Sequence, residues 1–231
     1  MQTSAIKKML HSLAIIFWLL PALLLTACEQ QQAPSKPAQH PPPQYKGTII
    51  AVGDSLTAGL GVMENEAWPA LLEKKLQNNG YLWQVINAGI SGETSSGLVS
   101  RIQWILSRQP DVVILETGAN DGLRGIPPAV IRQNISNAVQ ILENGNVTVI
   151  LAGMQIVQNL GADYTDEFAD IYPAIAGKQG CLLIPFLLDQ VAGEPGLNQA
   201  DTIHPNRKGH KIVSETVYPY VLQAIKARPE F

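Results

Sequence analysis

The chain has 231 residues, of which 46% are hydrophobic and 15% charged, and its formal net charge is −3. This length suits one domain with an appendage, and the apolar content is enough for a sizeable core. Without its first 27 residues the chain would lose two lysines and no acidic residue, which takes the net charge from −3 to −5. A negative balance argues against nucleic acid as a partner, because phosphate binding needs concentrated Lys and Arg.

The N-terminus has the parts of an export signal. Two lysines supply positive charge, an uncharged run covers Leu13–Leu25, and the tetrapeptide Leu-Thr-Ala-Cys ends at Cys28. The run is short for a membrane span and typical of a signal peptide. The tetrapeptide resembles the lipobox of bacterial lipoproteins, in which the Cys is acylated and becomes the mature N-terminus. We expect a lipoprotein signal peptide over residues 1–27 and a lipid anchor on Cys28. An uncleaved anchor or an ordinary secretory signal stays open.

A tether follows the expected lipidation site. Residues 28–45 are rich in Gln and Pro and cannot bury enough surface to fold, so we expect an extended linker of on the order of 50 Å. Glu29 is not the Asp that tends to retain Gram-negative lipoproteins at the inner membrane, which favours the periplasmic face of the outer membrane. Cys181 opens an apolar run and is interpreted as a buried thiol without a partner.

From residue 46 to residue 231, strand-like and helix-like patterns alternate. Apolar runs typical of strands cover Thr48–Val52, Gln84–Asn87, Val112–Glu116, Val147–Leu151 and Leu182–Ile184. Helical spacing joins residues 68–76, 102–106 and 131–142, and a last helix begins near residue 212, where Pro219 should kink or split it. Continuous apolar runs between helices indicate a parallel sheet with both faces covered. We therefore predict an α/β fold: a flavodoxin-like three-layer α/β/α sandwich with a five-stranded parallel sheet.

Ser55 follows the first predicted strand directly. The strand breaks at Gly53, and in open α/β sheets ligands bind beyond the carboxyl ends of the strands. A serine in that place can act as a nucleophile. The alternative is that Ser55 only caps the next helix, since Gly-Asp-Ser is a common tripeptide.

Two further polar stretches leave the sheet at the same edge, Asn87–Thr94 after the second strand and Glu116–Gly122 after the third. A hydrolase stabilises its oxyanion with donors that are fixed before the reaction. The backbone N–H groups of Ser55 and Gly89 and the side-chain amide of Asn120 are three candidate donors. Taken singly, each stretch is more often only a turn.

The candidate base is found by elimination among four histidines. His11 and His40 fall in the signal peptide and the tether. His204 has Asp201 three residues before it, so one turn can bring the carboxylate to the imidazole, as the third member of a catalytic triad requires. An Asx-type turn with an incidental His is the alternative. His210 has two lysines and no acid nearby and is predicted to lie on a helix surface.

No metal or cofactor site competes with this arrangement. Two domain histidines without the spacing of a zinc-binding helix, and a single domain Cys, give too few ligands for zinc. The sequence has no phosphate-binding loop and no dinucleotide fingerprint. We expect neither a metal nor a cofactor.

Four segments in order are far more specific than any one of them. They are Gly53-Asp54-Ser55-Leu56, Gly89 within Asn-Ala-Gly, Gly118-Ala119-Asn120-Asp121, and Asp201-x-x-His204. From about residue 46 onward the chain resembles the SGNH or GDSL hydrolase family, named for its Ser, Gly, Asn and His. Residues 67–72, 122–125, 171–173 and 201–206 look like its bacterial multifunctional thioesterase, lysophospholipase and arylesterase branch.

The resemblance implies a role for each matching residue. It implies Ser55 as nucleophile, Asp201 and His204 as its partners, and Ser55, Gly89 and Asn120 as the oxyanion hole. In that branch the loop after the Asn moves to meet acyl chains, and its residues here are Asp121, Gly122, Leu123 and Arg124. The chain departs from the branch at Ala119, where Gly is common.

The expected function is hydrolysis of carboxylic esters and thioesters through an acyl-enzyme on Ser55. Lysophospholipids, aryl esters and short or medium acyl esters are the expected small-molecule or lipid substrates, because an exported enzyme meets little acyl-CoA. Two alternatives stay open: an esterase that removes O-acetyl groups from cell-envelope polysaccharide, and a lipoprotein that kept the fold but only binds. The α/β-hydrolase fold is disfavoured, because Thr57 stands where its Gly-x-Ser-x-Gly elbow needs Gly. The oligomeric state stays open.

Overall fold

A computed structural model describes residues 44–156 and 160–228. The expected signal peptide, Cys28 and the expected tether up to residue 43 lie outside the described residues. Residues from Pro43 onward form one compact unit. Within the described ranges, no helix is both long and apolar enough to cross a membrane.

A single parallel sheet of five strands organises this unit, with the strand order β2-β1-β3-β4-β5. The strands are β1 (Gly47–Gly53), β2 (Trp83–Gly89), β3 (Val112–Glu116), β4 (Thr148–Ala152) and β5 (Leu182–Ile184). Every neighbouring pair is parallel, so all five carboxyl ends lie at one edge. The predicted α/β fold with a five-stranded parallel sheet is confirmed.

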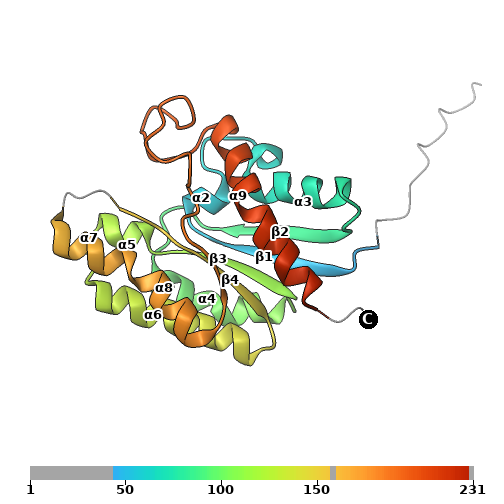
Figure 1. Ribbon diagram of the computed structural model, residues 1–231, viewed down its shortest axis with the longest axis horizontal. Coiled ribbons are helices and arrows are strands. Elements are labelled where there is room, and N and C mark those ends of the chain that lie inside the picture. The colour runs from blue at the N-terminus through green and yellow to red at the C-terminus, as the bar shows by residue number, and fades with distance from the viewer. Residues whose placement is uncertain (1–43, 157–159, 229–231) are drawn as a thin grey trace, which may run out of the picture. The chain divides into compact units, whose positions relative to one another are not determined.

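Helices cover both faces of the sheet. They are α2 (Ser55–Ala58), the 3₁₀ turn η2 (Glu64–Glu66), α3 (Trp68–Asn78), α4 (Ser95–Ser107), α5 (Ala119–Leu123), α6 (Pro128–Asn144), α7 (Ala162–Ala169), α8 (Ile171–Gln179) and α9 (Arg207–Lys226). Figure 1 shows α3 and α9 on one face and α4, α6 and α8 on the other. This double cover explains the continuous apolar runs of the inner strands, whose side chains have no solvated face.

Two features of the C-terminal half differ from the sequence-based expectation. Helices α7 and α8 were not predicted, because α7 is short and buries only Phe168, while α8 is apolar over most of its length and shows no helical period. Helix α9 is continuous through Pro219, which was expected to kink or split it. Pro219 and Glu215 are both exposed, so the carbonyl that loses its helical donor faces water.

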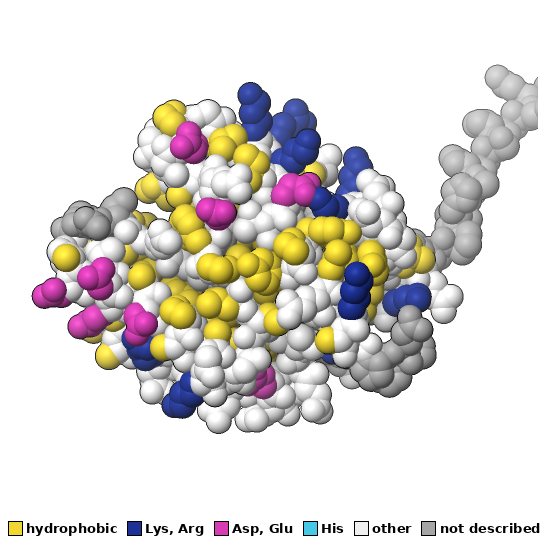
Figure 2. Space-filling model, viewed as in Figure 1, with side chains coloured by type: hydrophobic (Ala, Val, Ile, Leu, Met, Phe, Trp, Pro, Cys, Tyr) yellow, Lys and Arg dark blue, Asp and Glu magenta, His cyan; other side chains and the backbone are white. Residues whose placement is uncertain are grey.

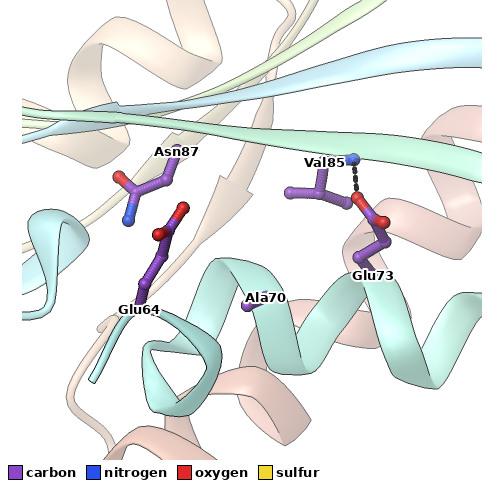
Figure 3. A pocket seen from close by; sticks show the side chains of 5 residues that line it. All are labelled: Glu64, Ala70, Glu73, Val85 and Asn87. Atoms are coloured by element: carbon purple, nitrogen blue, oxygen red, sulfur yellow. Dashed lines mark hydrogen bonds between the residues drawn. The ribbon is translucent and has the colours of Figure 1, made fainter. Parts of the chain in front are cut away.

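The edge strand β2 is protected by a side chain of α3. Oε2 of Glu73 accepts a hydrogen bond from the backbone N–H of Val85 at 2.6 Å (Figure 3). Edge strands with free N–H groups invite pairing with other chains, and this carboxylate occupies one of them. Glu73 and Val85 line a small pocket together with Glu64, Ala70 and Asn87.

The surface charges are segregated. Figure 2 shows acidic side chains over α7 and basic side chains over the first turns of α9. The basic cluster is interrupted by carboxylates, since Lys75 pairs with Glu215 and Arg207 pairs with Glu66. This face is therefore not a continuous positive surface.

The predicted surface position of His210 is wrong. Only 1% of this residue is exposed, because it lies on the face of α9 that packs against α3. Its Nδ1 accepts the backbone N–H of Trp68 at 3.3 Å. Burial, aided by the nearby His204, lowers the pKa of His210 to about 4, so the buried ring is neutral.

We predict that this neutral ring makes the fold sensitive to mild acid. The unfolded chain takes up a proton at His210 near the ordinary pKa of 6.5, whereas the folded chain resists it down to about 4. Stability should therefore fall as pH drops through this window, by roughly 2 kcal/mol between pH 7 and pH 5. In urea unfolding, His210→Asn should remove most of that loss, and Lys211→Asn, on the exposed face of α9, should retain it. Equal losses in both variants would contradict the assignment.

Candidate active site

The first turn after β1 presents Ser55. Ser55 is the first residue of α2, and Asp54 caps that helix by accepting the N–H of Leu56 at 2.9 Å. The loop after β2 is tied to the same place, because Ile90 donates its N–H to the carbonyl of Gly53 at 2.8 Å. Ser55 is thus held at the carboxyl edge of the sheet, which is the position expected from the sequence.

Ser55, His204 and Asp201 form a continuous hydrogen-bonded chain. Oγ of Ser55 lies 2.8 Å from Nε2 of His204. Nδ1 of the same ring lies 2.6 Å from Oδ2 of Asp201. Both ring nitrogens are therefore occupied in the pattern by which a carboxylate fixes the imidazole tautomer and leaves Nε2 to accept the serine proton.

The turn that carries Asp201 and His204 is built by the Asp itself. Oδ1 of Asp201 accepts the backbone N–H groups of Ile203 and His204, each at 3.0 Å. Thr202 between them has φ of 62°, a left-handed conformation that a β-branched residue seldom adopts. The N–H of His204, then its ring and the N–H of Ile203, lower the pKa of Asp201 to about 2. The carboxylate, which is exposed to solvent, therefore stays ionised at neutral pH.

Gly89 and Asn120, the other two expected oxyanion donors, lie at the ends of the two strands that flank β1, with Asn120 in α5 just after β3. Gly89 ends β2, and a side chain there would collide with the backbone of Ala58 in α2, so only glycine permits this approach. Its N–H donates to Oδ1 of Asn87 at 3.0 Å. The amide of Asn120 donates to Oδ2 of Asp54 at 2.9 Å, which leaves its second N–H available.

Asp121 does not belong with the substrate-loop residues among which it was predicted. Only 1% of it is exposed, and both carboxylate oxygens bind Ser95 at the start of α4. Oδ1 accepts the Ser95 hydroxyl at 2.6 Å, and Oδ2 accepts the Ser95 N–H at 2.8 Å. Asp121 therefore anchors α5, the short helix that carries Asn120. It was missed because a buried structural carboxylate and an exposed loop Asp look alike in sequence.

Two of the three remaining residues of the expected substrate loop, Leu123 and Arg124, are accessible. Leu123 is 53% exposed, and Arg124 donates to the carbonyl of Gly92 at 3.1 Å, which joins this loop to the one after β2. Gly122 lies inward, where a Cβ would meet Ile156 and Phe168.

All five loops at the carboxyl edge expose a large apolar side chain. These side chains are Leu60 after β1, Ile90 after β2, Leu123 after β3, Leu160 after β4 and Ile203 after β5. Exposed apolar residues gathered at a functional edge are typical of a site that receives an apolar ligand. Among the described residues, no three His, Cys, Asp or Glu side chains gather as metal ligands would.

Cys181 is the free cysteine of the described residues and is half-buried. Burial, followed by the charge of Glu143, raises its pKa to about 11. Its thiol stays protonated at neutral pH and is a poor nucleophile.

Comparison with known proteins identifies the family. The family model described as the GDSL-like Lipase/Acylhydrolase family matches residues 51–212. The chain is 40% identical over 173 residues to esterase TesA of Pseudomonas aeruginosa, which covers 74% of this chain and 86% of that protein. It is 36% identical over 169 residues to thioesterase 1/protease 1/lysophospholipase L1 of Escherichia coli strain K12, which covers 73% and 80%.

A solved structure agrees with these relatives. The crystal structure of the psychrotrophic esterase EstA from Pseudoalteromonas sp., inhibited by monoethylphosphonate, matches with a TM-score of 0.75 and 32% identity. The match covers 78% of this chain and 99% of that one. The chain belongs to the GDSL-like lipase/acylhydrolase family and has the SGNH hydrolase fold. It is a serine esterase, that is, a carboxylic ester hydrolase.

We predict that Asp121→Asn destabilises the domain by about 2 kcal/mol or more. The new amide group would face the N–H or the hydroxyl of Ser95, which leaves a buried donor without an acceptor. Asp166→Asn, on the exposed face of α7, is the matched control and should change stability by less than about 0.5 kcal/mol. Urea unfolding of the two variants measures both values, and equal stabilities would refute the anchoring role.

Proposed function

We propose that this esterase acts through an acyl-enzyme on Ser55, with His204 as general base and Asp201 as the group that orients His204. The observation that carries the proposal is the pair of contacts on one ring: Ser55 Oγ at 2.8 Å from Nε2 and Asp201 Oδ2 at 2.6 Å from Nδ1. An incidental serine and histidine have no reason to share this geometry.

Each proton has a place in the proposed reaction. His204 takes the Ser55 proton as Oγ attacks the ester carbonyl, and Asp201 stabilises the imidazolium that forms. The tetrahedral intermediate collapses, and the leaving alcohol or thiol takes the proton from His204. Water then enters, gives a proton to His204 and attacks the acyl-enzyme, after which the proton returns to Ser55 with release of the acid.

The proposed oxyanion hole uses the N–H of Ser55, the N–H of Gly89 and the free N–H of Asn120. Among the described residues the N–H of Ser55 has no hydrogen-bond partner, so it is available. The N–H of Gly89 donates to Asn87, and its use requires that the Asn87 side chain turn away when substrate arrives. Apo hydrogen bonds of this kind commonly rearrange in the Michaelis complex.

The proposed substrates are esters and thioesters with an apolar acyl group, lysophospholipids among them. The exposed apolar side chains of the loops at the carboxyl edge of the sheet support this class, because they can contact an acyl chain that the polar triad cannot. The names of two relatives, an esterase and a thioesterase and lysophospholipase, point the same way.

The proposed location is the periplasmic face of the outer membrane. We infer a lipoprotein whose signal peptide covers residues 1–27, whose anchor is Cys28 and whose tether reaches residue 45, followed by the catalytic domain over 46–231. The lipobox-like tetrapeptide and Glu29 support this inference. A tethered esterase at a membrane would meet lysophospholipids at their source.

We predict that variants lacking one of the proposed catalytic groups lose activity although they fold. On a p-nitrophenyl ester, Asn120→Ala should lower kcat by about 10²–10³, as for other lost oxyanion donors. Ser55→Ala should lose more than that and should no longer react with a fluorophosphonate. Ser91 is an exposed serine in the loop after β2, and the control variant Ser91→Ala should keep wild-type activity. Activity should fall at acid pH, because a general base must be unprotonated to accept the Ser55 proton, while Asp201, with a pKa of about 2, stays ionised. Normal turnover by Ser55→Ala would sink the mechanism.

We predict that Cys28→Ala abolishes lipid attachment and leaves the esterase chemistry intact. The acylated Cys supplies the membrane affinity in a lipoprotein, and the catalytic residues lie elsewhere in the chain. Labelling with radioactive palmitate and membrane fractionation should detect the wild type in the membrane fraction and detect no label on the variant. An unchanged, membrane-bound mature variant would exclude the anchor.

A further inference from the structure

Glu116 is a buried carboxyl group that the proposed mechanism does not use. It ends β3, the strand between β1 and β4, and its exposure is 0%. Its side chain lies against the turn that presents Ser55, so closely that a Cβ on Gly53 would collide with Oε2. A carboxyl group in such a place is costly unless it is fully hydrogen-bonded or neutral.

The two oxygens of Glu116 have different surroundings. Oε2 accepts the N–H of Asp54 at 2.9 Å and the hydroxyl of Thr57 at 3.0 Å. Oε1 is buried, and no donor among the described residues reaches it. An ionised oxygen without a donor would be unstable there, whereas a protonated Oε1 can itself donate.

A second buried carboxyl group, that of Asp54, lies beside Glu116, whose Oε2 accepts the Asp54 N–H. Burial and then the charge of Asp54 raise the pKa of Glu116 well above its ordinary value. Burial raises the pKa of Asp54 as well, but each of its two oxygens accepts a hydrogen bond, one from the Leu56 N–H and one from the Asn120 amide, and these oppose the rise. Asp54 therefore holds the negative charge, and the proton belongs to Glu116.

The other charged groups around the pair do not change this assignment. Asp121 and Tyr172 lie in the same interior and bring no positive charge: burial raises the pKa of the Tyr172 phenol well above its ordinary value, and its hydroxyl donates to the carbonyl of Thr117 at 2.9 Å. Arg101 reaches the carbonyl of Gly53 at 3.5 Å but is paired with Glu93. Among the described residues, neither Lys nor Arg contacts Glu116 or Asp54 directly.

We propose that Glu116 is a neutral carboxylic acid that positions the nucleophile turn through the two hydrogen bonds that its Oε2 accepts. Through Asp54 it acts on both halves of the proposed site, since Asp54 caps α2 at Ser55 and holds the amide of Asn120. Through Oε2 it holds the backbone of Asp54 and the side chain of Thr57. Glu116 touches no reacting atom and is a positioning residue. This inference rests on the proposed function of Ser55 and Asn120.

Two substitutions of Glu116 distinguish the role of its hydrogen bonds from the role of its side-chain volume. Glu116→Gln keeps an oxygen for Asp54 N–H and Thr57 and places an N–H where the acid proton is. We expect its kcat to stay within about threefold of wild type, because the amide imitates a neutral acid. Glu116→Leu keeps the volume and loses every hydrogen bond. We expect its kcat to fall by about 10²-fold with little change in KM, as for a misplaced catalytic group. Glu143→Gln, remote from the site on α6, is the control for loss of a carboxyl group.

Infrared difference spectroscopy tests the proton directly. The spectrum of the wild type minus Glu116→Gln at neutral pH should contain the carbonyl stretch of a protonated carboxylic acid, and the spectrum with Glu143→Gln should not. A missing band would overturn the proposal, and so would Glu116→Gln as impaired as Glu116→Leu, or Glu116→Leu as active as wild type. If Glu116→Leu does not fold, the band and the kcat of Glu116→Gln decide. Ser55→Ala should keep the band, so a failure of the proposed nucleophile is distinguishable from a failure of this inference.

Discussion

The hydrogen bond between Ser55 and His204 joins residues 149 positions apart, and the placement of most other elements makes it possible. Ser55 is fixed by β1, which lies inside the sheet with β2 and β3 on either side. His204 is fixed by the turn before α9, whose buried face packs on α3. Neither partner could reach the other without a sheet whose strands all end at one edge.

The carboxyl groups behind the triad are buried, so each of them needs hydrogen-bond donors or a neutral form. Asp54, Glu116 and Asp121 are three carboxyl groups with almost no exposure, gathered near the ends of β1 and β3. Asp121 is satisfied by Ser95, while Asp54 is satisfied by Leu56 and Asn120. Glu116 has fewer donors than oxygen sites, which is why its protonation state matters. Such networks stabilise one arrangement of the loops only when each member is hydrogen-bonded.

The sheet and the candidate triad residues could both be predicted from the sequence, for different reasons. Buried parallel strands leave continuous apolar runs, so all five strands were found within one or two residues. Asp201 and His204 were found because two histidines in the domain left few candidates. The site roles stay predictions, but their geometry agrees with what an acyl transfer needs.

What the sequence concealed depends on tertiary packing. His210 sits between lysines and looks solvated, yet helix α9 turns it toward α3. Asp121 looks like part of an exposed loop, yet it binds Ser95 from a neighbouring helix. The sequence contains one indication of the buried Glu116, because this acidic residue ends an otherwise apolar strand. Burial and partner identity for these three groups come from segments far away in the chain, so local pattern could not reveal them.

Asp201 and His204 are held together by a single tetrapeptide, with Oδ1 of Asp201 closing the turn on the backbone of His204. The proposed base and the carboxylate that orients it therefore form one unit of fixed internal geometry. Insertions or deletions in the connection over residues 185–200 would shift both groups together and leave the distance between them unchanged. Variation in that connection can remodel the mouth of the site while the Asp201–His204 pair keeps its internal alignment.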